Sequence, residues 1–581
     1  MLLAFLALLG AAPGNAVTMV AALKAIPFFA AVLGTNPGFI GRLILMIRNR
    51  EWLGILQWWG EWILSLAALA VIVAAPFSTY KMIWCVLFAA SAATNWFFYR
   101  TNRSHLTVLD VMTASYERAA SSAFIRHYLW QFTSAGLVFA FCVMLFAVPA
   151  VADPDWQAWA VSLWWLPLLS VALVIGEFWL QGGRTLSPMP SHVSAISAAL
   201  LATFLLHTSK LGARRAVSWQ PQANAKKQSI VMLVDESIRG DYISLKPGNA
   251  LTPKLAALAK EQGFINFGPA VSGGNNSGNA NAILRFGANI ENLADSATFN
   301  PSLFAYAKKA GFRTIYINAQ TSLLRNGNDL MNFMTAYEKL DIDAFYVTKD
   351  LIKSDYELAD IVALELRSGQ PVFIYGNKNG AHFPYEWNYP KDEKKPWVSR
   401  KAEIPHAIAP LLETYRKAIA WNVDGFMPYF FQRADLSNAT VIYTSDHGQQ
   451  FKSSKFPHGQ ITNPDPRTGL VPLLVHTRHK ALRQAFTQGA RRSTGRASHF
   501  QIAPCLYQLM GYAPEDIAKA YPESLFTGSK AMPRMVTGDI FGILRSSQPV
   551  VTTIDPSLDY FERSHQPIFH GQGKDQVLTF V

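Results

Sequence analysis

Ile230–Ser237 reads IVMLVDES, in which five apolar residues run directly into two carboxylates and a serine. A short apolar run of this length is typical of a strand that is buried on both faces, as in a parallel sheet. Similar runs recur further along the chain and alternate with helical stretches. This alternation predicts an α/β sandwich around a mostly parallel central sheet.

The same patterns predict the other strands and the helices of this region. The strands are Thr314–Ile317, Val372–Tyr375, Val441–Tyr443 and Leu473–His476, all expected to be buried and parallel. The helices are Pro253–Gln262, Ser302–Ala310, Ser354–Leu366 and Ala407–Gln432. Because ligands of parallel sheets bind beyond the carboxyl ends of the strands, side chains that follow strands are the first candidates for a functional site.

The region before residue 211 has a different composition. Only 7 of the 39 Asp and Glu residues of this 581-residue chain lie there, and long apolar runs fill the space. A helix needs about 20 apolar residues to cross a membrane, so we expect five or six spans in a multi-pass α-helical membrane domain. The candidate spans are Ala16–Gly34, Trp62–Phe77, Met82–Phe98, Phe132–Ala152, Ala158–Leu180 and His192–His207.

A polar stretch, Ala213–Gln228, separates the apolar region from the α/β region. We therefore predict a transmembrane domain over residues 1–210, a linker over 211–228 and an α/β domain over 229–581. The net charge of +13 fits a surface that meets anionic lipid or a phosphate-bearing substrate. The basic residues are scattered and accompany no nucleic-acid-binding motif, which argues against a nucleic-acid partner.

The three cysteines predict neither a disulfide framework nor a cysteine-based zinc site. Cys85 and Cys142 lie inside apolar runs, and Cys505 is the single cysteine of the α/β region. A framework of disulfides needs paired cysteines, and a structural zinc site of this kind needs several thiolates.

Two strands end in residues that can hold a metal ion. The strand before Asp446 is followed by Asp-His-Gly, and a second His-Gly pair follows at His458. Carboxylate and imidazole groups are ligands suited to Zn²⁺, and glycine permits a tight turn. Glu236, at the end of the first strand, lies where the same cation could be held. The alternative for Glu236 alone is an ordinary solvated strand end.

The segment Val271–Ala280 is a loop rich in Gly and Asn that opens into a helical stretch. Ser277 in this loop is either a helix N-cap or a nucleophile that faces an anion. A free serine is a poor nucleophile, and a bound metal ion lowers its pKa. Both interpretations stay open on the loop alone.

His382 follows the strand Val372–Tyr375 in another glycine-containing loop. From there it could bind a substrate phosphate or protonate a leaving group. A lone histidine in a loop more often has no such role. Among the remaining histidines, His499 is the strongest candidate for a further function.

Together these blocks resemble the bacterial phosphoethanolamine transferases, including those that modify lipid A. The resemblance covers roughly residues 80–530, and it is strongest in Val234–Asp241, the Ser277 loop, Asn377–Tyr389 and Thr444–Gly459. It implies that Glu236, Ser277, Asp446 and His447 hold zinc and that Ser277 is the nucleophile. It also implies that His382 and His458 contact the transferred phosphate. Asn275 and Arg325 are further candidates for substrate binding.

The resemblance further implies a membrane helix bundle joined to an alkaline-phosphatase/sulfatase-like domain in the periplasm, anchored in the inner membrane. The implied donor is phosphatidylethanolamine, and the implied acceptor is an envelope glycolipid or glycan, such as lipid A or core oligosaccharide. Two features depart from the family pattern. Gly273 and Ser277 stand where the family usually has Cys and Thr, and Asn318–Arg325 poorly matches the segment that holds the ethanolamine end.

Other functions of the same superfamily remain open, namely glycerol phosphate transfer and phosphodiester hydrolysis. A sulfatase is disfavoured, because its nucleophile is normally followed by Pro and Arg where this chain has Asn279 and Asn281. The non-enzymatic alternative is a membrane scaffold whose sulfatase-like domain binds lipid or glycan without turnover.

Overall fold

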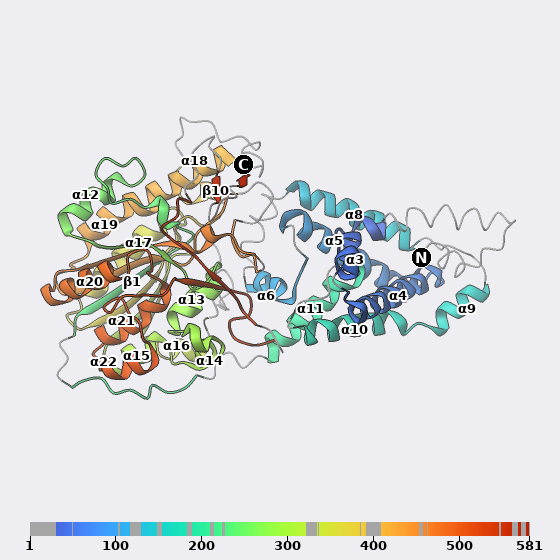
Figure 1. The fold of residues 1–581 in the computed structure, drawn as a ribbon, viewed down its shortest axis with the longest axis horizontal. Helices are drawn as coiled ribbons and strands as arrows, with labels where there is room; N and C mark the ends of the chain where they lie inside the picture. Colours follow the sequence, from blue (N-terminus) through green and yellow to red (C-terminus); the bar gives the residue numbers. More distant parts are fainter. Residues whose placement is uncertain are drawn as a thin grey trace. The chain divides into compact units, whose positions relative to one another are not determined.

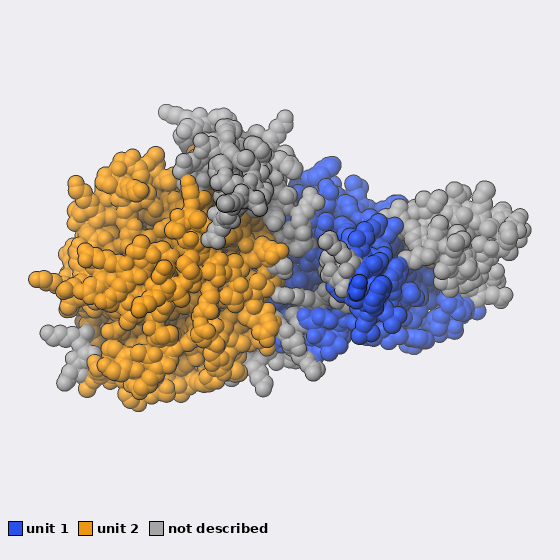
Figure 2. Space-filling model, in the orientation of Figure 1, with its two compact units in different colours: residues 1–115, 128–209, 543–547 blue, residues 116–127, 210–542, 548–581 orange. Residues whose placement is uncertain are grey.

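The computed structural model contains two compact units (Figures 1 and 2). One comprises residues 1–115, 128–209 and 543–547, and the other comprises residues 116–127, 210–542 and 548–581. The structure describes residues 31–48, 50–102, 105–116, 129–147, 154–181, 183, 189–208, 214–223, 227–320, 334, 336–383, 385–390, 408–451, 457–461, 463–544, 548–560, 568–570 and 577–579.

The first unit is helical, as the composition of this region predicts. Its helices are α3 (Phe39–Arg48), α4 (Trp52–Ala74), α5 (Thr79–Asn102), α6 (Val108–Tyr116), α8 (Leu129–Ala147), α9 (Pro154–Ser162), α10 (Leu166–Leu180) and α11 (Ser191–Thr208). Within the described ranges, α4, α5 and α8 are long and apolar enough to cross a membrane, and α10 and α11 are shorter apolar helices.

Two of the expected spans need comment. The span predicted over Ala158–Leu180 is interrupted, since α9 ends at Ser162 and α10 begins at Leu166. Pro167 lies in the first turn of α10, where its missing N–H costs nothing, so it favours a new helix start at this point. Most of the span predicted over Ala16–Gly34 lies outside the described residues. The total of five or six spans therefore stays a prediction.

Polar side chains of the first unit bond to one another across helices. Ser65 Oγ on α4 lies 2.9 Å from His192 Nε2 on α11, and Gln57 Nε2 on α4 donates to Glu177 Oε2 on α10 at 2.7 Å. Asn95 Nδ2 on α5 donates to the carbonyl oxygen that begins α11 at 3.0 Å. Polar groups in an apolar unit are costly without such partners, so these contacts fix which helix faces meet.

The second unit is built on a seven-stranded sheet with the strand order β2-β7-β6-β1-β5-β3-β4. The strands are β1 (Ser229–Asp235), β2 (Ile265–Val271), β3 (Arg313–Asn318), β4 (Ala344–Val347), β5 (Val372–Asn377), β6 (Ala439–Ser445) and β7 (Leu470–Thr477). β1 is central and pairs in parallel with β5 and β6. The mostly parallel sheet predicted from the apolar runs is confirmed.

The direction of one strand was predicted wrongly. The segment Leu473–His476 belongs to β7, which runs antiparallel to both of its neighbours, β2 and β6. A parallel neighbour requires a crossover that carries the chain to the opposite edge of the sheet, usually through a helix. In the described part of the connection from β6 to β7, the chain forms only a 3₁₀ turn, Pro466–Gly469, and it re-enters from the edge where β6 ended.

Helices cover both faces of the sheet. Alternate side chains of β1 are therefore buried against different helix layers. Ile230 and Met232 pack with residues of α15 (Leu303–Lys309), α20 (Lys480–Arg492) and α21 (Ile502–Leu509). Val231 and Leu233 pack with residues of α12 (Pro253–Gln262), α17 (Ser354–Leu366), α18 (Ile408–Ile419) and α19 (Phe426–Arg433). The remaining helices and strands are α13 (Ser277–Arg285), α14 (Leu293–Phe299), α16 (Ala336–Lys339), α22 (Pro514–Ala520), β8 (Arg534–Thr537), β9 (Val550–Thr553), β10 (Ile568–His570) and β11 (Val577–Thr579).

Two of the predicted helices have the predicted bounds, and a third is divided into two helices. The predicted helices Pro253–Gln262 and Ser354–Leu366 coincide with α12 and α17. The single helix predicted over Ala407–Gln432 is instead α18 and α19 joined by a π-helical turn, Ala420–Gly425. A π-helical turn is a single wide turn inside a helix, and a run of apolar residues at helical spacing does not show where such a turn occurs.

The described part of the predicted linker lies along the second unit. Arg215 N donates to the carbonyl oxygen of Phe299 at 2.8 Å, and Gln222 N donates to that of Gly511 at 2.9 Å. Between them the ring of Trp219 lies against four tyrosine rings, those of Tyr306, Tyr507, Tyr512 and Tyr521. Residues 214–223 are therefore bound to the α/β unit.

Candidate functional site

The site begins where the two central strands end. Asp235, the last residue of β1, is paired with Ser445, the last residue of β6, so Glu236 and Asp446 leave the sheet side by side. The carbonyl oxygen of Asp235 accepts hydrogen bonds from Asp446 N at 2.8 Å and from Ser445 Oγ at 3.0 Å. The register of the sheet thus places the two carboxylates at one edge.

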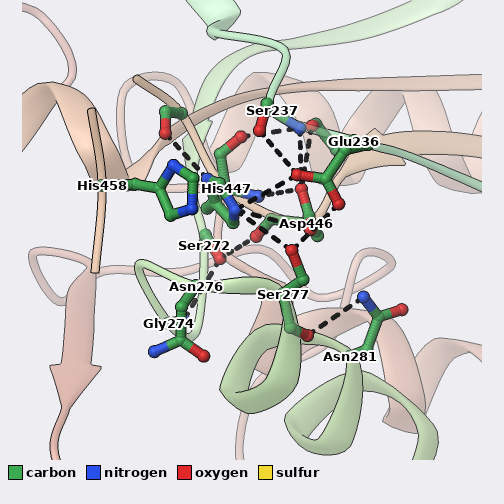
Figure 3. A network of polar contacts seen from close by, with 12 residues as sticks. Glu236, Ser237, Ser272, Gly274, Asn276, Ser277, Asn281, Asp446, His447 and His458 are labelled. Atoms are coloured by element: carbon green, nitrogen blue, oxygen red, sulfur yellow. Dashed lines mark hydrogen bonds and ion pairs between the residues drawn. The ribbon is translucent and has the colours of Figure 1, made fainter. Parts of the chain in front are cut away.

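Glu236, Asp446 and His447 form a buried cluster at this edge (Figure 3). Each offers a ligand atom, and these atoms lie within 4.8 Å of one another. His447 Nε2 is 3.4 Å from Glu236 Oε1 and 3.6 Å from Asp446 Oδ2. Three of the four residues predicted to bind metal are therefore brought together by the fold.

Ser277 faces this cluster from the start of α13 (Figure 3). Its Oγ donates to Glu236 Oε2 at 2.9 Å and lies 3.3 Å from His447 Nε2. Ser277 is not the N-cap of α13, because Asn276 holds that position and its Oδ1 accepts from Asn279 N at 2.9 Å. Because Asn276 supplies the cap, the Ser277 hydroxyl does not cap the helix and contacts Glu236 and His447 instead.

The cap residue supports a stability prediction. Asn276→Ala removes the acceptor for the N–H of Asn279, so we expect the free energy of unfolding to fall by about 1 kcal/mol. Asn276→Asp keeps a side-chain acceptor and is expected to stay near the wild-type value. Denaturant unfolding of the two variants measures the difference, and equal stability of both variants would contradict the assigned cap.

The donor atoms fit a divalent cation. Asp446 Oδ1 accepts from Ser237 N at 2.9 Å and from His447 N at 2.6 Å, whereas the buried Oδ2 has no hydrogen-bond partner among the described residues. His447 Nδ1 lies 2.8 Å from the carbonyl oxygen of Gly448. A proton on Nδ1 satisfies that contact and leaves the Nε2 lone pair facing the carboxylates, the usual arrangement of a histidine ligand. Two carboxylates and one imidazole are ligand types that suit Zn²⁺, and the Ser277 oxygen lies beside them.

The pKa values of these groups are set mainly by burial. Burial raises the pKa of Asp446 well above its usual value, and the neighbouring charge of Glu236 adds to that rise. Burial alone would also raise the pKa of Glu236, but His447, His382 and the Ser237 hydroxyl outweigh it and lower the pKa. Burial lowers the pKa of His447, which keeps the imidazole neutral. Of these two neighbouring carboxylates, Asp446 is therefore the one that takes up a proton more readily.

The raised pKa of Asp446 gives a pH-dependent prediction. Below that pKa a divalent cation must displace the proton of Asp446, so zinc binding is expected to release up to one proton there. Because the pKa of Asp446 is raised, zinc affinity falls as the pH is lowered through that pKa. His447, whose pKa is lowered, adds to the loss only at more acidic pH.

Isothermal titration in two buffers of different ionisation enthalpy measures the proton count. Ser277→Ala is the control, because it keeps Glu236, Asp446 and His447 and lacks the serine hydroxyl as a second source of protons. Zinc binding by the wild type with no proton release would show that Asp446 is already ionised and would contradict the assigned raised pKa.

His458 lies beside the cluster. Its ring centre is 4.2 Å from that of His447, and its Nδ1 is 3.1 Å from Gln449 Oε1 (Figure 3). Burial lowers the pKa of His458 well below its usual value, and the neighbouring His447 acts in the same direction. A neutral imidazole can accept a proton or a hydrogen bond at the edge of the site.

His382, Asn275 and Arg325 are the other residues predicted to contact the substrate. His382 is half-buried and close enough to Glu236, His447 and His458 to affect their pKa values. Asn275 connects two loops, since its Nδ2 donates to the carbonyl oxygen of Gln460 at 2.8 Å. Arg325 lies outside the described residues.

One residue at the site was not predicted. Gln320 Nε2 donates to Glu236 Oε2 at 2.9 Å and to the carbonyl oxygen of Lys378 at 3.2 Å. Gln320 lies two residues beyond the end of β3, so the rule that functional side chains follow strand ends could have identified it. It adds a third hydrogen-bond donor to the Glu236 carboxylate, besides Ser277 and Ser237.

His499 lies behind the site. Its Nδ1 is 3.3 Å from Ser272 Oγ and its Nε2 is 3.1 Å from Thr444 Oγ1. Ser272 Oγ donates to the carbonyl oxygen of Asp446, so His499 supports the backbone of a cluster residue without joining the cluster. Burial lowers the pKa of His499 to about 3, so it is a neutral hydrogen-bonding group.

The two asparagines that follow Ser277 are used within the protein. Asn279 Nδ2 donates to the carbonyl oxygen of Gly538 at 3.0 Å, and Asn281 Nδ2 donates to that of Ser277 at 3.1 Å. Tyr375 OH donates to Asn281 Oδ1 at 2.7 Å. At the two positions after the nucleophile where sulfatases have Pro and Arg, this chain therefore has neutral side chains. Their hydrogen bonds fix the loop that carries Ser277.

Comparisons with known proteins agree with this fold. Residues 228–512 match the family model described as Sulfatase. Comparison with curated protein sequences gives no match. Among solved structures, the chain is similar to the integral membrane lipooligosaccharide phosphoethanolamine transferase A (EptA) of Neisseria meningitidis. The identity is 14% and the TM-score is 0.56, over 78% of this chain and 89% of that chain.

Two further solved structures show weaker likeness. The periplasmic domain of EptC from Escherichia coli, in complex with Zn, is 19% identical with a TM-score of 0.45, over 60% of this chain and 98% of that one. The phosphonate monoester hydrolase of Agrobacterium radiobacter is 16% identical with a TM-score of 0.39, over 54% of this chain and 81% of that one. The likeness to the neisserial structure confirms the predicted fold class, a helical region with long apolar helices followed by a sulfatase-like α/β domain.

Proposed function

We propose that the protein, whose residues 228–512 match the family model described as Sulfatase, is a membrane-bound transferase that moves phosphoethanolamine from phosphatidylethanolamine to a cell-envelope acceptor. The proposal has transmembrane, linker and catalytic parts over residues 1–210, 211–228 and 229–581. It places the catalytic part in the periplasm of a bacterial cell and the membrane part in the inner membrane. The acceptor class is an envelope glycolipid or glycan, such as lipid A or core oligosaccharide.

One observation carries the proposal. The Ser277 hydroxyl is held between a carboxylate and an imidazole that also belong to a zinc-type ligand set, with Oγ 2.9 Å from Glu236 and 3.3 Å from His447. A serine in such surroundings is poised as a nucleophile, because an adjacent base can accept its proton and a bound cation would stabilise its oxygen. A scaffold that only binds lipid or glycan needs no such arrangement.

The reaction proceeds in two displacements at phosphorus. In the first, a bond forms between Ser277 Oγ and the donor phosphorus, the bond to the glycerol oxygen breaks, and diacylglycerol leaves with a proton. In the second, a hydroxyl or phosphate oxygen of the acceptor bonds to the same phosphorus, and Ser277 Oγ leaves and is protonated. Each step exchanges one P–O bond for another.

The residues of the site have different roles in these two displacements. Glu236, Asp446, His447 and Ser277 would hold zinc, which when bound supplies positive charge beside the serine oxygen and the phosphoryl oxygens. Glu236 accepts the hydrogen bond of the Ser277 hydroxyl and so orients its oxygen. His382 and His458 would hold the phosphoryl oxygens or move the protons of the leaving groups. Asn275 and Arg325 remain candidates for contacts to the substrate.

Lipid analysis tests the donor. The purified full chain is incubated with phosphatidylethanolamine, and diacylglycerol release and the intact mass of the protein are measured. We expect diacylglycerol together with a phosphoethanolamine adduct on the protein. Release without any adduct on an active preparation would remove the covalent step.

Parallel incubations separate the alternatives within the superfamily. Phosphatidylglycerol in place of phosphatidylethanolamine tests glycerol phosphate transfer, and a donor without acceptor tests simple hydrolysis. An adduct formed only from phosphatidylglycerol would replace ethanolamine with glycerol in the proposal. Free phosphoethanolamine without transfer to any envelope acceptor would favour a phosphodiesterase.

A further inference from the structure

Lys378, the first residue after β5, is a fully buried lysine. Its Nζ lies 2.5 Å from Asp235 Oδ2 and 3.4 Å from Asp355 Oδ2, and it donates to the carbonyl oxygen of Asn422 at 2.6 Å. The ring centre of Phe426 is 4.2 Å away. A buried ammonium group is costly unless charged and polar partners enclose it, so the positions of these partners are tightly constrained.

One partner joins Lys378 to the carboxylate ligands. Asp235 directly precedes Glu236, and its Oδ1 accepts from Glu236 N at 3.1 Å. Tyr443 OH donates to Asp235 Oδ2 at 2.8 Å, the oxygen that also meets Lys378. The backbone of Asp235 accepts from Asp446 N, so this residue fixes both strand ends that carry the cluster.

The second partner joins Lys378 to the loop that carries His382. The carboxylate of Asp355 accepts from Asn379 N at 2.7 Å and from Gly380 N at 3.2 Å. Gly380 has a φ of +50°, and a Cβ built there would lie 2.2 Å from Asp235 Oδ1. The loop therefore packs directly against the strand end, and only glycine fits at this point.

The third partner comes from the π-helical turn. Asn422 Nδ2 donates to the carbonyl oxygen of Gly380 at 2.5 Å and to that of Asn388 at 2.8 Å. Asn388 Nδ2 in turn donates to the carbonyl oxygen of His382. Single π turns occur frequently at functional sites, and this one fixes the backbone on both sides of His382.

We infer that Lys378 is a positioning residue that holds the His382 loop in register with Glu236, Asp446 and His447. One ammonium group is shared by Asp235, which fixes the metal-ligand strand ends, and by Asp355, which fixes the loop. Without it, two buried carboxylates would face each other and push the loop away from the strand. The inference rests on the proposed function, in which His382 contacts the transferred group.

A double-mutant cycle tests the inference on the full-length protein. Lys378→Met removes the charge with little change of volume, and we expect the rate of phosphoethanolamine transfer to fall by about 10²-fold while bound zinc is retained. Because Lys378 acts through His382, the double variant Lys378→Met/His382→Gln is expected to be no slower than His382→Gln alone. Losses that multiply would overturn the inference.

Two further variants separate positioning from folding. Arg285→Met removes the partner of buried Glu338, 2.7 Å away, and its loss of rate is expected to multiply with that of His382→Gln. The charge-balanced variant Lys378→Met/Asp355→Asn removes one positive and one negative charge, so its thermal stability should exceed that of Lys378→Met. We expect its transfer rate to stay low. Full recovery of the rate would assign Lys378 to folding alone and overturn the inference.

Hydrogen exchange provides a readout that does not depend on transfer. The amides of Asn379, Gly380 and Ala381 are bonded to Asp355 and to the Glu236 carbonyl oxygen, and they are expected to exchange at least about tenfold faster in Lys378→Met. Unchanged exchange would overturn the inference even if the protein is an active transferase. Faster exchange in a protein that transfers nothing would support Lys378 and reject the proposed function instead.

Discussion

Replacing Ser277 with alanine is expected to abolish group transfer, with a loss of about 10³-fold or more, and to abolish the covalent adduct. The hydroxyl is the atom that bonds to phosphorus in the proposed reaction, and it is held at 2.9 Å from Glu236 by the start of α13. Alanine removes this atom and leaves the helix and its cap in place. The measurement is the intact mass of the protein after incubation with phosphatidylethanolamine, together with diacylglycerol release.

Two controls make this result specific to the nucleophile. Ser277→Ala keeps Glu236, Asp446 and His447, so it is expected to bind zinc and to unfold at nearly the wild-type temperature. Ser277→Thr keeps a hydroxyl at the same position and is expected to form the adduct. An adduct that persists in Ser277→Ala would place the covalent step on another residue and refute the proposed mechanism.

Loss of the metal ligands is expected to have the second large effect. Asp446→Asn and Glu236→Gln should each lose zinc and at least about 10³-fold of the transfer rate, because each removes one of two buried carboxylates that face the same point. The wild type should also be stabilised by zinc, since a ligand that binds only the folded state adds about 2.7 kcal/mol at a concentration 100 times its dissociation constant. Thermal unfolding during a zinc titration measures this gain.

The cation-free proteins supply the control for that measurement. Burial raises the pKa of Asp446 and so favours its neutral form when no cation is present, and asparagine has nearly the shape of that neutral form. Asp446→Asn is therefore expected to match the stability of the cation-free wild type and to gain nothing from added zinc. A zinc-dependent rise in its unfolding temperature equal to that of the wild type would show that the ion binds elsewhere.

The amino-acid sequence was sufficient to predict the parts of this protein that depend on local pattern. The apolar runs and the lack of acidic residues before residue 211 indicated helices of the membrane type, and the bounds of α12 and α17 followed from helical periodicity. Carboxylates directly after apolar strands marked Glu236 and Asp446, because residues that follow parallel strands share one edge of a sheet.

Contacts between distant segments depended on the tertiary structure. Ser277 lies 41 residues from Glu236 and 170 from His447 along the chain, and only the packing of α13 against the sheet edge brings its hydroxyl to both. Likewise, no local pattern indicates the antiparallel direction of β7 or the burial of Lys378 among Asp235, Asp355 and Asn422. Sequence periodicity reports which side chains are buried, whereas strand direction and side-chain convergence are set by sheet register and by hydrogen bonds between residues far apart in the chain.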